Sequence, residues 1–411
     1  MPLADELELP LLPAELPEFA ADPMPFVEAA RRAHPWLAKS NVGGYIVHGF
    51  YAARDIIGSD EDTHPFYPGI AAWYDAEGTR WGDFMSQMMN ATVGEKHRRL
   101  RASAQAAFTP KNINRYRGLM RQVISGLLDE WAPKGAFDFA EFASWFPISV
   151  FCGLLGVSPD VVPRIRDALE VQGESVSLDR AMRDPLLAAF DVLWDFVDSA
   201  VREREQTARG TTGLIDTMLA ARDAGMIDDT ELRQNLIMFA AGGYDTSRNM
   251  LAMIVYNIID KPAIWARCAA DIAYCRRVVN EGLRHSGIST VYRVAARDFE
   301  YDAVHFSKGT MLILMVSMAG RDPAYFADPM TFDPDRANAG QHVAFGRGQH
   351  YCIGMYLARA QIEEGLQLVA QRLPHLRLAG TPTWRSYLGI SGLQTLPVML
   401  DPAPVRELTP A

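Results

Sequence analysis

The sequence predicts a mainly helical protein with a small β region, folded as a single domain over residues 1–411. Segments with an apolar period of 3.6 residues cover much of the chain, whereas β-like segments are few and short. No Pro/Gly/Ser-rich linker, internal repeat or composition break divides the 411 residues. We therefore expect one large unit, although the length alone would allow two or three domains.

The expected helices and strands follow from local patterns. Seven segments carry apolar residues at helical spacing: 114–132, 139–156, 187–208, 213–224, 229–260, 262–286 and 355–373. Strands are expected where short β-like segments are bounded by Gly, Asp or Pro. These segments are Gly44–Val47, Val291–Val294, Met311–Val316 and Leu396–Leu400.

The helix expected over 229–260 is unusually long for a soluble protein. Asp228 and Glu231 have the spacing of a capping box at its start, and Pro262 follows its end. At about 1.5 Å per residue, the helix would run on the order of 45 Å. It would cross the whole molecule and form its structural spine.

Composition and charge exclude several classes of function. The chain is 49% hydrophobic and 22% charged, which is ordinary for a globular protein with a large core. A net charge of −10 argues against general nucleic-acid binding, which needs a basic surface. The acidic, proline-bearing start is unlike a secretory signal, and no run reaches the roughly 18 apolar residues of a membrane span. We expect a cytoplasmic protein with no membrane span and no nucleic-acid partner.

The cysteines point to one chemical site. Cys152, Cys268, Cys275 and Cys352 show neither a CxxC pair nor zinc-type spacing, which fits free thiols in a reducing compartment. Cys352 lies in the loop FGRGQHYCIG over 345–354, directly before an expected helix. Unpaired N–H groups and the positive dipole end at a helix start stabilise a thiolate. The alternative, a tight turn with a buried structural thiol, is disfavoured by the fixed order of glycines, aromatic and histidine.

A second motif, GGYDTS over 242–247, interrupts the long helix. Each glycine inside a helix costs up to about 1 kcal/mol relative to alanine, so the pair needs a local reason. Either a flat ligand approaches the helix there or two helices cross closely, and the sequence does not favour one over the other. The Thr246 hydroxyl could also bond a carbonyl one turn back and open a groove for water or oxygen beside Asp245.

Two charged groupings complete the pattern. Glu281 and Arg284 lie at i, i+3 on one helical face, where Arg336 could join them in a fixed network. His97 and Arg101 lie at i, i+4 and would face the same way, as a dianionic ligand requires. Taken alone, Glu281 and Arg284 are most simply a solvated surface pair of little energetic value. His97 and Arg101 alone are most simply part of an exposed basic turn.

In their order and separations, these four features resemble the soluble bacterial members of the cytochrome P450 family. The resemblance covers roughly residues 15–400, and the cysteine loop is its most specific part. It implies the cytochrome P450 fold, with haem b between the long central helix and the cysteine-bearing loop. It also implies a haem-thiolate monooxygenase that uses O2 and two electrons.

The resemblance also implies roles for individual residues. Cys352 would be the axial metal ligand of the haem iron. Asp245 and Thr246 would be the catalytic pair that delivers protons during oxygen activation. Glu281, Arg284 and Arg336 would form a structural triad on the cysteine side. The other cofactor-binding residues would be His97, Arg101, Arg293, Phe345, Gly346, His350 and Gly354.

The substrate is expected to be a hydrophobic small molecule such as a terpenoid, steroid, fatty acid or aromatic compound. Positions that resemble substrate contacts are mostly apolar or small: Met85, Met88, Ala241, Gly242, Ser289, Val291 and Ile390. Methionine-lined walls adapt to irregular apolar shapes. Ordinary core packing explains the Met-rich run over 85–89 nearly as well.

Electrons should come from another protein, because the length leaves no room for a flavin or nicotinamide domain. The expected partner is a ferredoxin with its NAD(P)H-dependent reductase, and a flavodoxin is the second candidate. Arg98, Arg347 and Arg359 match basic positions on the cysteine side and could form its docking patch.

Two other functions remain open from the sequence. The chain could be a haem-binding carrier or sensor without turnover, since a fold does not fix a function. It could also be an oxidase that performs coupling or dehydrogenation. Asp245 and Thr246 argue against the carrier, because a passive binder has no use for proton delivery.

Overall fold

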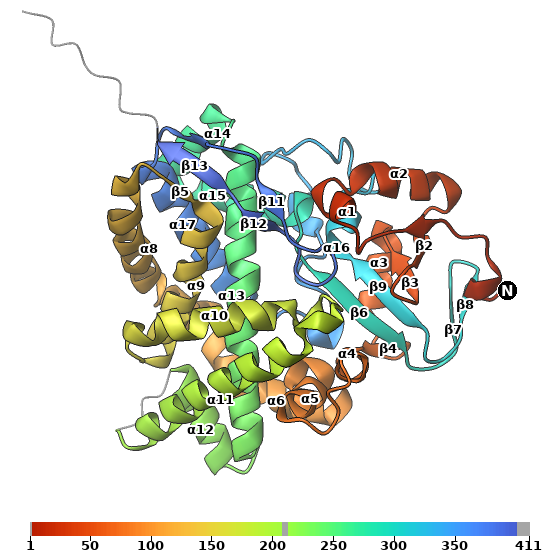
Figure 1. The fold of residues 1–411 in the computed structure, drawn as a ribbon, viewed down its shortest axis with the longest axis horizontal. Helices are drawn as coiled ribbons and strands as arrows, with labels where there is room; N and C mark the ends of the chain where they lie inside the picture. The colour runs from red at the N-terminus through yellow and green to blue at the C-terminus, as the bar shows by residue number, and fades with distance from the viewer. Residues whose placement is uncertain (1, 208–212, 401–411) are drawn as a thin grey trace, which may run out of the picture.

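A computed structural model describes residues 2–207 and 213–400. Helices make up most of it, and the strands of the largest sheet lie to one side of the long helix α13 (Asp229–Ile258), as Figure 1 shows. The mainly α class with a small β region is therefore confirmed.

Six of the seven expected helices are present within a few residues of their predicted bounds, namely α8, α9, α11, α12, α13 and α17; position 208, the predicted end of one, lies outside the described residues. The helices between residues 17 and 114, α10 and α16 were not predicted. The α-helices are α1 (Pro17–Ala21), α2 (Met24–Ala33), α3 (Phe50–Gly58), α4 (Tyr67–Trp73), α5 (Arg80–Gln87), α6 (Gly94–Gln105), α7 (Pro110–Asn114), α8 (Arg117–Trp131), α9 (Phe139–Leu155), α10 (Val162–Gly173), α11 (Arg183–Glu205), α12 (Leu214–Asp223), α13, α14 (Pro262–Ala270), α15 (Ile272–His285), α16 (Val316–Gly320) and α17 (Met355–Arg372).

The single helix expected over 262–286 is wrong, because two helices, α14 and α15, occupy that segment. Asp271 between them is extended, with φ −138° and ψ 112°, and its carboxylate accepts a hydrogen bond from the N–H of Ala273 at 2.7 Å. An N-cap of this kind begins a new helix. The apolar period runs across the break because both helices pack against α17.

Helix α13 has the predicted capping box and length. The N–H of Glu231 donates to Asp228 Oδ1 at 2.7 Å, and the N–H of Asp228 donates back to Glu231 Oε2 at 3.1 Å. The helix runs for 30 residues and packs against α9, α10, α11, α15 and α17. It therefore fixes the relative positions of elements that are far apart in the sequence.

The main sheet has six strands in the order β1-β2-β3-β9-β6-β4. Strand β6 runs antiparallel to both β9 and β4, which places Arg293 opposite Leu312 on one side and Pro65 on the other. All four expected strands are present, but β13 belongs to a separate sheet with β10 and β5. The strands are β1 (Leu11–Leu12), β2 (Leu37–Ser40), β3 (Tyr45–Val47), β4 (Thr63–Pro65), β5 (Ala136–Asp138), β6 (Thr290–Ala295), β7 (Phe299–Tyr301), β8 (Val304–Phe306), β9 (Met311–Met315), β10 (Leu376–Leu378), β11 (Thr383–Trp384), β12 (Leu393–Thr395) and β13 (Pro397–Leu400).

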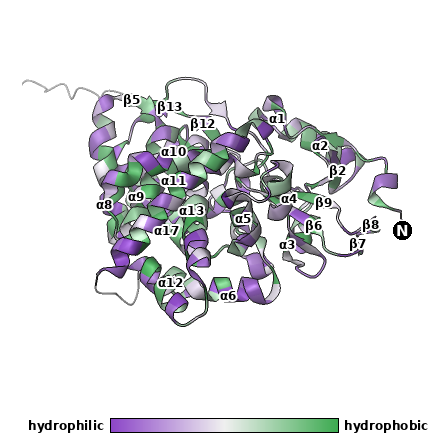
Figure 2. Cartoon of the chain, turned by 60° about the horizontal axis from the view of Figure 1, so that its bottom comes forward, coloured by the Kyte–Doolittle hydropathy of each residue, from purple (hydrophilic) through white to green (hydrophobic). Residues whose placement is uncertain are grey.

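Most helices mix hydrophobic and hydrophilic residues along their length, as Figure 2 shows. Such helices turn one face to the core and the other to water. Helix α9 differs, because apolar residues occupy most of its positions and it is buried among α8, α10 and α13. Among the residues that the structure describes, no helix is both long and apolar enough to cross a membrane.

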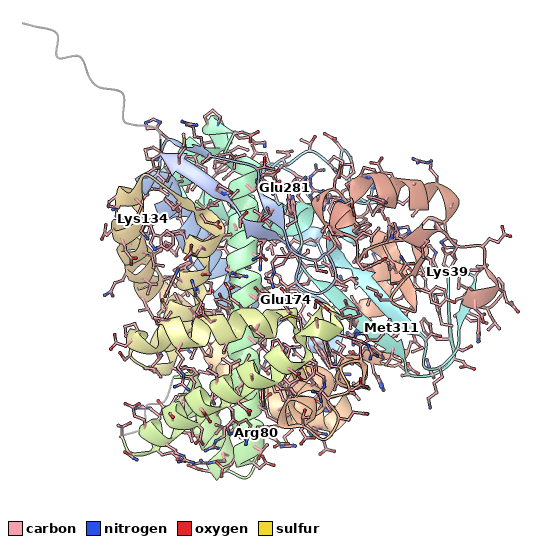
Figure 3. All side chains as sticks on the ribbon, viewed as in Figure 1. Lys39, Arg80, Lys134, Glu174, Glu281 and Met311 are labelled. Carbon is pink, nitrogen blue, oxygen red and sulfur yellow. The ribbon has the colours of Figure 1, made fainter. Side chains whose placement is uncertain are left out.

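Glu281, Arg284 and Arg336 meet in a buried network (Figure 3 labels Glu281). Arg284 donates to both carboxylate oxygens of Glu281, at 2.6 and 2.8 Å, and the two side chains have no exposed surface. Arg336 Nε lies 3.4 Å from Glu281 Oε1. Arg284 also donates to the carbonyl oxygens of Gly320 and Pro329, at 2.7 and 2.8 Å. The pair is therefore a cross-link between α15 and the following loops, not a solvated surface pair.

Candidate functional site

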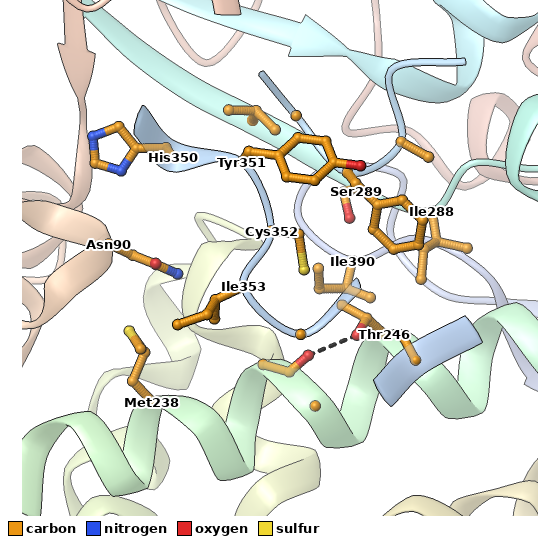
Figure 4. Close-up of a pocket in the computed structure, with 18 of the residues that line it drawn as sticks. Asn90, Met238, Thr246, Ile288, Ser289, His350, Tyr351, Cys352, Ile353 and Ile390 are labelled. Atoms are coloured by element: carbon orange, nitrogen blue, oxygen red, sulfur yellow. Dashed lines mark hydrogen bonds between the residues drawn. The ribbon is translucent and has the colours of Figure 1, made fainter. Parts of the chain in front are cut away.

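A cavity of about 340 Å³ lies between α13 and the loop over 345–354 (Figure 4). None of the described residues that line it is an aspartate or a glutamate. Its basic residues are Arg101, Arg293, Arg347 and His350. The apolar ones include Val176, Met238, Phe239, Met250, Ile288, Val291, Ile353, Leu357 and Ile390.

The loop over 345–354 presents the sulfur of Cys352 to this cavity. Gly346 and Gly348 have φ values of +70° and +67°, a region that favours glycine. A Cβ on Gly348 would also lie 2.9 Å from Asp60 Oδ2, so a side chain there would meet both strain and a clash. The N–H of Cys352 donates to the Phe345 carbonyl at 2.8 Å. The backbone thus sets the shape of the loop, and Phe345, Gly346 and Gly354 all line the cavity.

The surroundings of the Cys352 thiol disfavour its charged form. Burial raises its pKa above the ordinary value of a cysteine, while the N–H of Gly354 and the charge of Arg101 lower it less strongly. The Gly354 N–H at the helix start thus favours the thiolate, as the sequence argument expected, while burial works against it. A bound metal cation deprotonates a coordinating thiol outright, so the environment suits a metal ligand.

The paired glycines of α13 face open space. A Cβ on Gly242 or Gly243 would meet no atom within 4 Å, and both residues line the cavity. Close crossing of two helices is therefore the wrong reason for the pair, and access for a ligand is the one that the structure supports. Thr246 Oγ1 donates to the Gly242 carbonyl at 2.6 Å, one turn back, as Figure 4 shows.

A basic cluster borders the cavity. Arg101, Arg293 and His350 line it directly. His97 does not; its ring lies 4.2 Å from the His350 ring, and its two nitrogens lie 3.0 Å from the carbonyl oxygens of Met89 and Gln349. His97 therefore supports the cysteine loop from α6, one layer behind the surface of the cavity.

Several donors of this cluster make no hydrogen bond among the described residues. Arg293 Nε and Nη1 and His350 Nε2 are buried without a hydrogen bond, although Arg293 Nη2 donates to the Ile57 carbonyl at 2.9 Å. Burial lowers the pKa of Arg293 against the opposing effect of Asp60, and burial with the nearby Arg293 lowers the pKa of His350 to about 3. Unpaired buried donors cost free energy, so this part of the cavity fits an anionic ligand.

Asp245 lies off the cavity, on the side of α13 that faces α10. Its side chain is 2% exposed, and Oδ1 accepts hydrogen bonds from Arg385 at 2.6 Å and Arg248 at 3.0 Å. Arg385 also donates to Glu174, which follows α10 and is labelled in Figure 3. The predicted groove beside Asp245 is therefore wrong, because two guanidiniums and α10 occupy that side. Only Thr246 of the pair reaches the cavity.

The predicted substrate contacts divide into two groups. Gly242, Ser289, Val291 and Ile390 line the cavity. Met85, Met88 and Ala241 do not; the two methionines are buried in the core around α5. Their apolar spacing is that of a helix face turned to the core. Ala241 lies one position before Gly242, so its side chain points about 100° away around the helix.

Sequence reasoning missed several residues of the cavity. Met238 and Phe239 precede Gly242 by four and three positions on α13, so helical spacing alone places them on the same face. Tyr67, Asn90 and Val176 come from short or irregular segments without a periodic signal.

Taken together, the cavity fits the haem that the sequence resemblance implied. A sulfur lies on one side and a side-chain-free stretch of α13 on the other (Figure 4). Arg101, Arg293 and His350 supply unpaired or partly paired donors for propionates. The absence of carboxylates among the described lining residues suits a dianionic group.

Comparisons with known proteins agree with this site. The family model "Cytochrome P450" matches residues 177–389. Luteothin monooxygenase of Streptomyces thioluteus is 31% identical, and the match covers 96% of this chain and 97% of that protein. The 20-oxo-5-O-mycaminosyltylactone 23-monooxygenase of Streptomyces fradiae is 30% identical over 74% of this chain and 72% of its own length.

The solved structures add the fold. Epothilone D-bound cytochrome P450epoK superposes with a TM-score of 0.87 at 24% identity, covering 95% of this chain and 99% of that chain. The family model and the near full-length relative together show the family. The chain is thus an oxygen-incorporating oxidoreductase with haem b as its cofactor, and it belongs to the cytochrome P450 family.

Proposed function

We propose that residues 1–411 act as one domain that hydroxylates a hydrophobic small molecule, using O2 and two electrons from a separate redox protein. The observation that carries this proposal is the pairing of Thr246 and Cys352 in one cavity whose remaining surface is largely apolar. A hydroxyl on the side opposite the sulfur suits proton handling, and an apolar wall suits a hydrophobic substrate.

In this proposal Cys352 holds the haem iron, and Arg101, Arg293 and His350 bind the propionates. Gly242 and Gly243 allow close approach to α13. The bound haem supplies oxygen activation, which a thiolate ligand favours. The protein orients the substrate, excludes water and controls proton supply.

Thr246 lines the cavity in which the reaction would occur, and Asp245 lies next to it on the side of α13 that faces α10. Asp245 Oδ2 is buried without a hydrogen-bond partner among the described residues, whereas Oδ1 is held by Arg385 and Arg248. We propose that the Thr246 hydroxyl holds water or its equivalent at the cavity, and that Asp245 contributes to proton supply from the side of α13 that faces α10. The two arginines fix the direction in which the carboxylate points.

The substrate is proposed only as a class: a terpenoid, steroid, fatty acid or aromatic compound. The relatives are named for acting on luteothin and on a mycaminosyltylactone, and no single compound transfers to this chain at about 30% identity. Ser289 and Ile390, which form a β-bridge on the cavity wall, are the proposed contacts beside Gly242 and Val291.

The redox partner is proposed to be a ferredoxin, or a flavodoxin, with its NAD(P)H-dependent reductase. Arg98 and Arg347 are exposed on the cysteine side, and the exposed rings of Tyr351 and Tyr356 flank the same loop. Arg359 is half-buried and donates to Asn280 Oδ1 at 2.6 Å, so it is less available for docking.

The proposed substrate class is tested by titrating the haem-loaded protein with compounds from the four classes and following the spin-state shift of the haem. We expect a saturable shift with at least one hydrophobic compound. Gly242→Leu should weaken its binding about tenfold or more, because the side chain enters the cavity and overpacks it. Gly118→Leu, at an exposed open glycine on α8, is the matched control. Equal affinities in the two variants would contradict the placement of the substrate.

The role of Thr246 is tested with Thr246→Ala and Thr246→Ser. The alanine variant should keep haem binding but lose up to about 10²-fold in product formation, because the hydroxyl that manages protons is gone. Reducing equivalents should then appear as hydrogen peroxide. The serine variant, which keeps a hydroxyl, should restore much of the coupling between NAD(P)H consumption and product. Unchanged coupling in Thr246→Ala would refute this role.

Docking is tested by stopped-flow reduction with a ferredoxin at several salt concentrations. Arg98→Glu combined with Arg347→Glu should slow reduction by about tenfold or more at low salt and flatten its salt dependence, since two attractive charges become repulsive. Arg180→Glu, an equally exposed reversal near α11, serves as the control. If the reduction rate depended on salt equally in the double variant and in Arg180→Glu, the docking surface would have to lie elsewhere.

A further inference from the structure

A carboxylate lies directly behind the basic cluster. Asp60 follows α3, and its side chain is 10% exposed. Its Oδ2 accepts a hydrogen bond from the N–H of Gln349 at 3.0 Å. Its Oδ1 is buried without a hydrogen bond among the described residues and lies 3.6 Å from Arg293 Nη1 and 3.9 Å from His350 Nε2. Asp60 thus contacts both the cysteine loop and the proposed propionate-binding groups without lining the cavity.

The charges around the cavity do not balance if Asp60 is included. Arg293 is buried there and Arg101 is half-buried, whereas Arg347 is exposed and screened by water. Two guanidiniums match the two propionates of haem b. Asp60 adds a third negative charge that shares Arg293 with a propionate. A buried charge is screened little, so this excess acts strongly on groups nearby.

We propose that Asp60 is a positioning residue with two separable effects on the cofactor. Its Oδ2 anchors the cysteine loop through the Gln349 N–H, which helps to keep the Cys352 sulfur in place. Its charge keeps the reduction potential of the haem iron low, because the added electron of the ferrous state is disfavoured by a nearby negative charge. Arg293 transmits this effect, since it lies between Asp60 and the cavity.

Two side chains allow the hydrogen bond and the charge to be separated. Asparagine at position 60 keeps an oxygen that can accept from Gln349 but removes the charge, whereas alanine removes both. Asp62 provides a matched control two residues away, because its carboxylate bonds Ser59 and Arg297 on the outer side. Asp60→Glu keeps the charge and tests the geometry.

The experiment is a mediated redox titration of the haem-loaded proteins, in which each ferric iron takes one electron from dithionite. As a second measurement, the carbon monoxide difference spectrum of each reduced protein is recorded. Asp60→Asn should shift the ferric/ferrous midpoint to more positive values while keeping the thiolate-type band. Asp60→Ala should show the same positive shift and lose part of that band. Asp62→Asn and Asp60→Glu should keep the midpoint of the parent protein.

Three results would overturn the proposal. The first is a midpoint of Asp60→Asn that equals that of the parent or is more negative. The second is an equal positive shift in Asp62→Asn, which would indicate a general effect of surface charge. The third is failure of Asp60→Asn to take up haem, because the amide oxygen is expected to keep the bond to Gln349.

Discussion

The site depends on holding one sulfur atom inside a largely apolar cavity with no acidic or basic side chain bonded to it. Burial opposes negative charge on the Cys352 sulfur, and the Gly354 N–H and Arg101 offset only part of that cost. The loop is therefore held by backbone geometry: positive φ at Gly346 and Gly348, and the bond from the Cys352 N–H to Phe345. In the proposed site the haem iron would supply the missing charge, which would tie the shape of the loop to the cofactor.

The opposite wall obeys a complementary constraint. In the proposed site helix α13 would pass close to a flat group without presenting a side chain, and Gly242 and Gly243 leave that space open. The helix keeps its course despite the two glycines because other helices surround it and its start is capped. Thr246 then becomes the first hydroxyl to face the cavity from this stretch, while Asp245, one position earlier, is turned to α10.

Sequence reasoning succeeded where the information is local. The capping box at Asp228, the glycines of the cysteine loop and the spacing of Glu281 and Arg284 are each contained in a few residues. It failed where partners are remote: Arg385 lies 140 positions from Asp245, and Asp60 lies 289 positions from Gln349. Met85 in α5 and Met88 just after it were misplaced for another reason, since apolar residues at helical spacing line a core and a cavity alike. Asp271 was missed because an N-cap can break a helix without breaking its apolar period.

Ligation of the haem iron by Cys352 is tested most directly by the absorption spectrum of the reduced protein with carbon monoxide. Thiolate ligation predicts the red-shifted Soret band of a thiolate-bound ferrous carbonyl haem in the parent protein. It also predicts that Cys352→Ser loses this band, whereas Cys152→Ser, at a buried cysteine outside the cavity, keeps it. A parent protein without the red-shifted band, or a Cys352→Ser variant that retains it, would contradict the assignment of the ligand.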